Sequence, residues 1–224
     1  MKVKVIIPAS GSGQRFGGST PKQFLKIKGK EIIVHTIEKF HSIKLIDEII
    51  ISTKAEYLKK MLTLIKKNKF SKVKRIVEGG KVRQDSVYNA LRYVECDPDD
   101  IILVHDAVRP FISSKKITEL INLARRVKCV IPGMPITETI KKVDKRNMVE
   151  RTAERNGLWT IQTPQAFTFD VLKKSFDKAY KENFCGTDES SVVENAGYKV
   201  KVIKGEIENV KITVKEDLIR WLSI

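Results

Sequence analysis

The sequence contains few cysteines, few histidines and no long apolar run. Of its 224 residues, three are cysteine and three are histidine, and neither type is spaced like a set of metal ligands. Scattered single thiols are typical of a reducing compartment, so we expect a cytoplasmic protein without a transition-metal site built from its own side chains. No stretch approaches the roughly 20 apolar residues that a membrane helix needs. The first ten residues become polar too soon for a signal peptide and predict a buried strand, so we expect no membrane partner.

Aromatic residues are also scarce, whereas positive charge is abundant. Lysine and arginine number 43 against 27 acidic residues, which gives a formal net charge of +16. Such an excess attracts polyanions, so one hypothesis is a nucleic-acid-binding module, which salt-sensitive binding of DNA or RNA would reveal. With only 7% aromatic residues, however, no basic run is interleaved with stacking side chains. We therefore expect no nucleic-acid partner, and favour phosphorylated small molecules or a solvated lysine-rich surface.

Short β-branched runs alternate with amphipathic windows along most of the chain. We expect strands at 3–8, 46–52, 73–77, 101–105, 129–132, 199–203 and 209–214, and helices at 31–40, 55–67, 82–94, 117–126, 169–181, 188–195 and the C-terminus. This alternation predicts an α/β fold with a mostly parallel central sheet and helices on both faces. The length and the lack of a linker favour a single domain over residues 1–224.

One segment, residues 133–156, breaks the alternation. It is charged, and the polar turn at 144–147 separates two strand-like halves. This pattern predicts a projecting β-hairpin arm at about 133–156. An excursion of this length needs a function or a partner to pack on.

A glycine-rich loop follows the first predicted strand. Small residues at the end of such a strand let backbone N–H groups approach phosphate, which makes nucleotide-binding candidates of Pro8, Ala9, Ser10, Gly11 and Gly13. The cations Arg15 and Lys22 can neutralise a triphosphate and a phosphoryl-transfer transition state. The loop is not a P-loop, because GxxxxGK[ST] is absent. It also differs from a dinucleotide fingerprint, because its third glycine is misplaced and Pro21 prevents an immediate helix.

Further motifs follow in order along the chain. They are Glu78-Gly79-Gly80 with Arg83 and Ser86, His105-Asp106-Ala107 with Arg109, Arg155-Asn156-Gly157-Leu158-Trp159, Thr163-Pro164-Gln165, Thr187-Asp188-Glu189, and Asn209 to Thr213 with Lys211. Together with the first loop, this ordered set resembles the 2-C-methyl-D-erythritol 4-phosphate cytidylyltransferases of the non-mevalonate isoprenoid pathway, over essentially the whole chain. The resemblance implies a Rossmann-like nucleotidyltransferase fold.

The resemblance also implies an activity and a distribution of roles. The reaction would join CTP to 2-C-methyl-D-erythritol 4-phosphate, releasing pyrophosphate, with Mg²⁺ bridged mainly by the CTP phosphates and no certain protein ligand. The implied catalytic residues are Arg15, Lys22 and Lys211. The residues implied to bind the nucleotide are those of the first loop together with Gly79, Gly80, Arg83, Ser86, Asp106 and Ala107. The residues implied to bind the acceptor are Asp106, Arg109, Thr139, Arg155, Thr163 and Lys211. Thr139 and Arg155 would reach a partner's site from an exchanged arm, which implies a homodimer.

The chemistry of some residues also suggests a role without the resemblance. An inward Lys211 on the predicted strand 209–214 is costly unless it meets an anion. Asp106 and Arg109 follow a strand, where a carboxylate can hold a divalent ion or a sugar hydroxyl and a guanidinium can hold a phosphate. A ribitol-5-phosphate cytidylyltransferase is the alternative within the same class, and a uridylyltransferase is a more distant one. Ser10 and Glu138 depart mildly from the family pattern, whereas the segments 156–159 and 187–189 favour methylerythritol phosphate.

Overall fold

The computed structural model describes residues 1–11, 20–214 and 217 of the chain. These residues form an eight-stranded sheet in the order β10-β7-β11-β6-β1-β4-β5, with β12 also paired to β7. The strands are β1 (Val3–Pro8), β4 (Glu48–Thr53), β5 (Val73–Glu78), β6 (Ile101–Val104), β7 (Cys129–Pro135), β10 (Trp159–Ile161), β11 (Gln165–Thr168) and β12 (Lys201–Lys204). Parallel pairing joins β1 to β4 and β6, β4 to β5, and β12 to β7. The predicted mostly parallel α/β sheet is confirmed.

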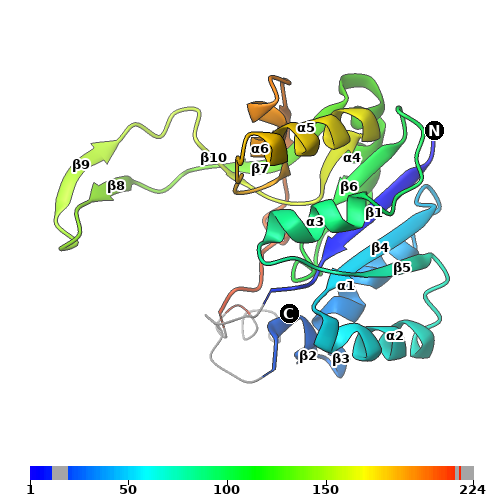
Figure 1. Ribbon diagram of the computed structural model, residues 1–224. Helices are drawn as coiled ribbons and strands as arrows, with labels where there is room; N and C mark the ends of the chain where they lie inside the picture. The colour runs from blue at the N-terminus through cyan, green and yellow to red at the C-terminus, as the bar shows by residue number, and fades with distance from the viewer. Residues whose placement is uncertain (12–19, 215–216, 218–224) are drawn as a thin grey trace.

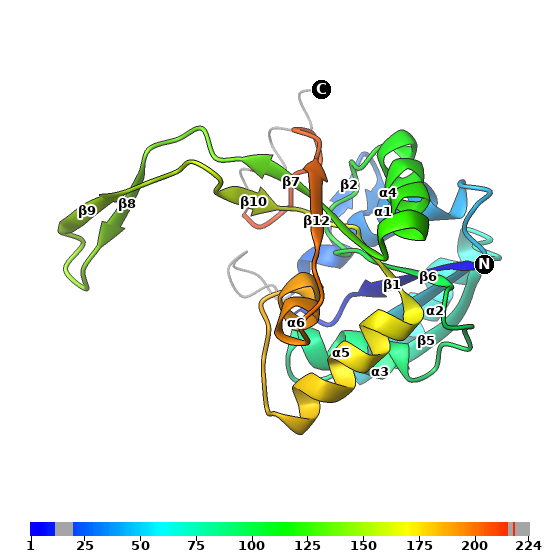
Figure 2. The ribbon, with the colours of Figure 1, turned by 90° about the horizontal axis from the view of Figure 1, so that it is seen from above.

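Helices cover both faces of this sheet (Figures 1 and 2). They are α1 (Ile32–His41), α2 (Leu58–Lys67), α3 (Arg83–Leu91), α4 (Ser114–Val127), α5 (Phe169–Lys181) and α6 (Glu189–Asn195). Alternate residues of β1 are buried on opposite faces, Val5 in a cluster with α1, α2 and α4, and Ile6 in a cluster with α3, α5 and α6. Burial on both faces explains why the strands read as continuous apolar runs in the sequence.

Two parts of the sheet were not predicted. Strand β11 lies between β6 and β7 and runs antiparallel to both. The short β10 runs antiparallel to the second half of β7. The small hairpin of β2 (Lys26–Ile27) and β3 (Lys30–Glu31) was also not predicted. These strands are two to four residues long, too short to show a periodicity of their own.

The predicted arm corresponds to a separate two-stranded sheet, β8 (Ile140–Val143) and β9 (Val149–Ala153). It extends away from the body of the molecule in both ribbon views (Figures 1 and 2). In the turn, Asp144 Oδ1 accepts hydrogen bonds from the backbone N–H groups of Arg146 and Met148. Residues 133–135, predicted as part of the arm, instead belong to β7 and pair with β10.

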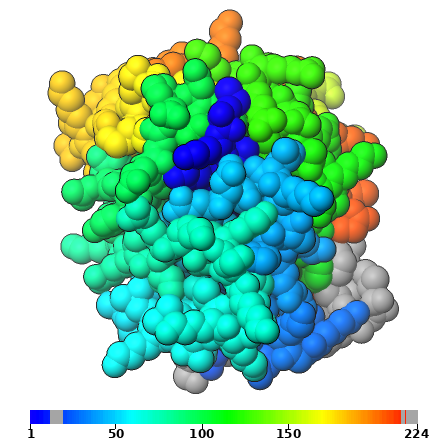
Figure 3. Space-filling model, turned by 90° about the vertical axis from the view of Figure 1, so that its right-hand side faces the viewer, coloured from blue at the N-terminus to red at the C-terminus, as the bar shows by residue number. Residues whose placement is uncertain are grey.

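Seen from the side opposite the arm, the body presents the cyan and teal segments that include α2 and β5 (Figure 3). Strand β5 is the last strand on this side of the sheet. In the described part of the chain, no helix is both long and apolar enough to cross a membrane. The predicted C-terminal helix lies outside the described residues.

Candidate active site

The predicted site residues of the body follow strands that end at one edge of the sheet. Strands β1, β5 and β6 are parallel members of one sheet, so the loops that follow them leave at the same edge. Strand β11 runs the other way and starts with Gln165 opposite Val104, the last residue of β6. Thr163 therefore lies at the same edge, although it precedes a strand.

The start of the first loop is held by Gln23. Its buried side-chain amide donates hydrogen bonds to the carbonyls of Ala9, at 2.8 Å, and Gly11, at 3.2 Å. No role was predicted for Gln23. Lys22 lies in a 3-10 helix, Lys22–Phe24, directly beside it. The predicted residues Gly13 and Arg15 lie outside the described residues.

The second loop, after β5, requires glycine at both of its positions. A Cβ atom on Gly79 would lie 1.8 Å from Ser10 Oγ, and one on Gly80 would lie 2.0 Å from the Cβ of Asp85. The first and second loops are therefore in direct contact. The Ser86 hydroxyl accepts a hydrogen bond from the Gly80 N–H and donates one to the Val82 carbonyl, so it stabilises this loop.

The centre of the site is the carboxylate of Asp106, which three cations surround. Arg83 Nε lies 3.1 Å from Oδ1, Arg109 Nε 3.3 Å from Oδ2, and Lys211 Nζ 3.0 Å from Oδ2. Burial disfavours ionisation of Asp106, but the attraction of the three cations outweighs it and holds the pKa of this carboxyl well below its usual range. The carboxylate is therefore ionised at neutral pH.

Arg83 bridges Asp106 to a second buried carboxylate. Its Nη1 lies 2.6 Å from Oε1 of Glu189, a residue whose side chain is 1% exposed. Burial lowers the pKa of Arg83, but the two carboxylates raise this pKa by more than burial lowers it. The net shift is upward, and the guanidinium stays charged. Sequence reasoning quoted Glu189 as part of a motif but did not place it at the site.

A buried hydrogen-bonded chain fixes the backbone around Asp106. The Thr163 hydroxyl accepts from the Asp106 N–H at 3.1 Å and lies 3.0 Å from His105 Nδ1, while His105 Nε2 lies 2.9 Å from the Arg109 carbonyl. Burial lowers the pKa of His105 to about 4, so its ring is neutral at pH 7. In the consistent arrangement of protons, Thr163 donates to Nδ1 and Nε2–H donates to Arg109. Thr163 thus helps to shape the loop, as does His105, for which no role was predicted.

The predicted strand 209–214 is wrong, because this segment follows the 106–109 loop instead of joining a sheet. Arg109 Nη1 donates to the Asn209 carbonyl at 2.7 Å, and the Asn209 amide donates to the Thr163 carbonyl at 2.8 Å. The N–H of Ile212 donates to the Val108 carbonyl. These side-chain contacts replace a strand ladder and place Lys211 against Asp106. Neither the contacts of Asn209 nor the loss of the strand has a signal in the sequence.

Ala107, Thr139 and Arg155 are the remaining predicted residues. Ala107 is buried, and its carbonyl accepts from the Thr36 hydroxyl on α1. Thr139 and Arg155 are exposed at the base of the arm, where Arg155 Nη1 donates to the Thr137 carbonyl at 2.6 Å. The structure does not bring these two arm residues to the Asp106 cluster of their own chain.

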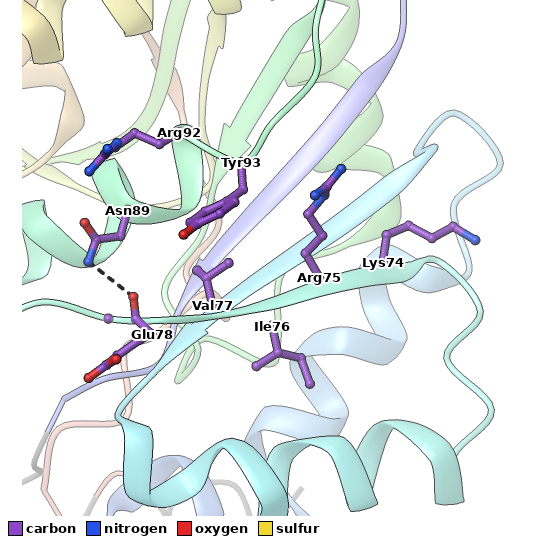
Figure 4. A pocket seen from close by; sticks show the side chains of 9 residues that line it. Lys74, Arg75, Ile76, Val77, Glu78, Asn89, Arg92 and Tyr93 are labelled. Atoms are coloured by element: carbon purple, nitrogen blue, oxygen red, sulfur yellow. Dashed lines mark hydrogen bonds between the residues drawn. The ribbon is translucent and has the colours of Figure 1, made fainter.

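A hollow of about 700 Å³ lies elsewhere, beside β5 (Figure 4). Its lining comes from β5 and α3 and comprises Lys74, Arg75, Ile76, Val77, Glu78, Gly79, Asn89, Arg92 and Tyr93. Of the predicted site residues that the structure describes, only Gly79 lines it. The site around Asp106 is thus distinct from this hollow.

Comparison with known proteins points to one family. The family model for 2-C-methyl-D-erythritol 4-phosphate cytidylyltransferase matches residues 3–222. A protein of that name from Clostridioides difficile is 44% identical over 96% of this chain and 90% of its own length. Another, from Dictyoglomus thermophilum, is 45% identical over 99% of this chain and 95% of its own length.

Solved structures agree with the sequence matches. The 2-C-methyl-D-erythritol 4-phosphate cytidylyltransferase of Francisella tularensis superposes with a TM-score of 0.82 and 34% identity, covering 99% of this chain and all of that one (100%). The 4-diphosphocytidyl-2C-methyl-D-erythritol synthase of Anaerococcus prevotii superposes with a TM-score of 0.83 and 29% identity, covering 99% and 95%. The chain belongs to the 2-C-methyl-D-erythritol 4-phosphate cytidylyltransferase family.

Proposed function

We propose that the cations around Asp106, together with the first loop, bind CTP and 2-C-methyl-D-erythritol 4-phosphate and carry out cytidylyl transfer between them. The chain is a nucleotidyltransferase of this family, and its products are 4-diphosphocytidyl-2-C-methyl-D-erythritol and pyrophosphate. The observation that supports the proposed site most is the convergence of Arg83, Arg109 and Lys211 on one carboxylate. These cations come from three separate segments, and a triphosphate needs such a concentration of positive charge.

The reaction exchanges one phosphorus–oxygen bond for another. An oxygen of the acceptor's phosphate attacks the α-phosphorus of CTP in line, and the bond from that phosphorus to the bridging oxygen of the β-phosphate breaks. The electron pair leaves with pyrophosphate. Because a phosphate dianion is already nucleophilic, the site needs no general base, and its contribution is positioning and charge stabilisation.

Lys22, Lys211 and Arg15 stabilise the charge that builds on the transferred phosphoryl group. Lys211 is suited to this role because its side chain is 38% exposed and touches Asp106 through one ammonium group, so it can turn to a phosphate oxygen. Arg109 is held by the Asn209 carbonyl and by Asp106, which suits a rigid contact to the acceptor.

The nucleotide is assigned to the first two loops. Backbone groups of Pro8, Ala9, Ser10, Gly11 and Gly13 face the triphosphate, and the base is read at Gly79, Gly80, Arg83 and Ser86, with Asp106 and Ala107 beside the sugar. One observation supports a ligand here: Arg83 Nη2 and Ser10 Oγ are buried and have no hydrogen-bond partner among the described residues. Buried donors of this kind are costly unless a ligand pairs with them.

The acceptor is assigned to Asp106, Arg109, Thr163 and Lys211 of one chain and to Thr139 and Arg155 of a second. We infer a homodimer in which each arm reaches the partner's site. In support, the arm projects from its own body, and its side chains Val143, Met148 and Val149 are exposed, as expected of a surface that a partner covers. The family pattern at 156–159 favours methylerythritol phosphate over ribitol 5-phosphate.

We assign Mg²⁺ to the phosphate oxygens of CTP. Among the residues that the structure describes, no three His, Cys, Asp or Glu side chains gather as metal ligands do, and both oxygens of Asp106 face cations. This donor set fits an ion that the nucleotide would carry, with Asp106 as the carboxylate of the site that could contact it. When bound, the ion neutralises charge on the phosphates. We also place the enzyme in the cytoplasm, since its three cysteines are free thiols.

Pyrophosphate release tests the proposal. With CTP and Mg²⁺, we expect turnover with 2-C-methyl-D-erythritol 4-phosphate and much slower turnover with ribitol 5-phosphate. Lys22→Ala should lower turnover by roughly 10²-fold or more, as the loss of one transition-state donor does. Lys67→Ala, which removes an exposed lysine of α2, is the matched control. Normal turnover by Lys22→Ala, or equal rates with the two acceptors, would refute the corresponding assignment.

A further inference from the structure

Glu189 is a buried carboxylate for which the proposed reaction has no use. It is the first residue of α6, and its Oε1 receives the hydrogen bond from Arg83 Nη1. Arg83 in turn donates through Nε to Asp106 Oδ1. One guanidinium therefore joins two carboxylates that come from distant segments of the sequence.

The position of Glu189 is firmly fixed. Asp188 caps α6, with its Oδ1 accepting from the Ser191 N–H and its Oδ2 from the Gln165 amide at 2.6 Å. The same Gln165 side chain accepts from the Ser190 N–H. The α6 residues that follow, Val192 and Val193, are buried in the core. Glu189 is thus attached to β11, which starts beside the Asp106 loop, and it is rigid enough to orient another side chain.

The three cations divide the two oxygens of Asp106 between them. Arg83, which is also paired with Glu189, contacts Oδ1, whereas Arg109 and Lys211 contact Oδ2. Two carboxylates then balance three cations. If Glu189 lost its charge, one carboxylate would face all three cations, and Arg83 would be free to compete for Oδ2.

We propose that Glu189 is a positioning residue for cytidylyl transfer, which acts through Arg83 to set the geometry of Lys211 and Arg109 at Asp106. The inference rests on the proposed function of this cluster and adds to it a residue that does not touch either substrate. It gives a role to an acid that is buried behind the site, where water screens its attraction for Arg83 little. Burial raises the pKa of Glu189, and the attraction of Arg83 opposes this shift.

Two substitutions of Glu189 separate the effect of its charge from the effect of its length. Glu189→Gln keeps the size and removes the charge, and Glu189→Asp keeps the charge and shortens the reach. We expect Glu189→Gln to lower kcat by about tenfold or more with a change of less than about threefold in the KM for CTP, and Glu189→Asp to recover part of kcat. Glu194→Gln, an exposed carboxylate on the same helix, should match the wild type.

A double-mutant cycle identifies the intermediary. If Glu189 acts through Arg83, the double variant Glu189→Gln/Arg83→Lys should be no slower than Arg83→Lys alone. Effects that multiply, or a Glu189→Gln turnover within about twofold of the wild type, would overturn the inference. Should Glu189→Gln fail to fold, Glu189→Asp and its double variant with Arg83→Lys give the same comparison. Absent turnover by the wild type and by Glu194→Gln would overturn the proposed function as well.

Discussion

Lys211 Nζ lies 3.0 Å from Asp106 Oδ2, so the C-terminal segment contributes a cation to a carboxylate at the start of the loop that follows β6. The neighbouring Asn209 holds this segment in place through its carbonyl and its amide. The cluster around Asp106 is therefore complete only when the C-terminal segment has folded onto the loop that follows β6.

Removal of the Lys211 charge should lower the catalytic rate strongly and the stability of the fold only slightly. We expect Lys211→Met to lower kcat/KM by roughly 10²-fold, because a cation at the transferred phosphoryl group is lost. Asp106 keeps Arg83 and Arg109, so the melting temperature should change little. Initial rates and a thermal melt measure the two effects. A variant that unfolds readily, or one that keeps full activity, contradicts this role.

The neutral ring of His105 makes stability depend on pH. Burial lowers its pKa from the ordinary 6.5 to about 4. In this window the unfolded chain binds a proton that the folded chain does not, so stability is complete above pH 6.5 and falls as the pH drops toward 4. Between pH 6.5 and 5 the loss amounts to about 2 kcal/mol.

Urea unfolding of His105→Asn at both pH values tests this dependence. The variant should lose less stability on acidification than the wild type, because the titrating ring is gone. His35→Asn removes a half-buried histidine of α1 as a control and should keep the dependence. The same slope in His105→Asn and in the wild type would show that another group is responsible.

Gly79 should not tolerate alanine. The added methyl would overlap Ser10 Oγ, and Ser10→Ala cannot restore the space fully because Ser10 Cβ would still lie 2.8 Å away. We expect Gly79→Ala to raise the KM for CTP several-fold and to lower the melting temperature. Gly11→Ala, whose Cβ meets nothing within 4 Å, should melt like the wild type. An unchanged KM in Gly79→Ala would mean that the two loops can separate without cost.

Exchange of arms can be tested by complementation. A Lys22→Ala chain has a defective body and an intact arm, whereas an Arg155→Ala chain has the reverse. If arms exchange within a dimer, a reassembled equal mixture should regain about a quarter of wild-type turnover, since half of the dimers are mixed and each of these has one intact site. No gain on mixing would place Arg155 in the site of its own chain or outside any site.

Divalent metal should be needed for turnover but not for folding. With Mg²⁺ held mainly by the nucleotide, EDTA should abolish pyrophosphate release and leave the melting temperature unchanged. Added Mg²⁺ should restore the rate fully. A large drop in melting temperature with EDTA would instead reveal a structural ion bound by the protein.

Sequence patterns predicted the parts of the molecule in which a local pattern, such as an apolar run or a glycine-rich loop, determines the structure. Strands β1, β4 and β6 are buried on both faces, and the predicted loops at the same edge of the sheet carry glycines and charges, so both the sheet and its candidate functional edge could be inferred. The interaction partners of those charged residues could not be inferred from the sequence. Glu189 and His105 act through contacts between distant segments, and no local periodicity encodes such contacts.

The C-terminal segment illustrates the same limit. Val210 and Ile212 flank Lys211 as in a strand, yet hydrogen bonds from Arg109 and Asn209 side chains determine the path of the backbone. Tertiary contacts thus override local β-propensity here. Strand β11 was missed because its position between β6 and β7 depends on the antiparallel return of the chain.

In the proposed site, the carboxylate of Asp106 stands in for the negative charge of the ligand. Before any nucleotide arrives, the carboxylate already gathers mutually repelling cations and keeps them in order. In the proposed reaction, binding of a triphosphate is then an exchange of anions, in which Lys211 passes from carboxylate to phosphate. The work of bringing like charges together is done once, during folding, and need not be repeated in each catalytic cycle.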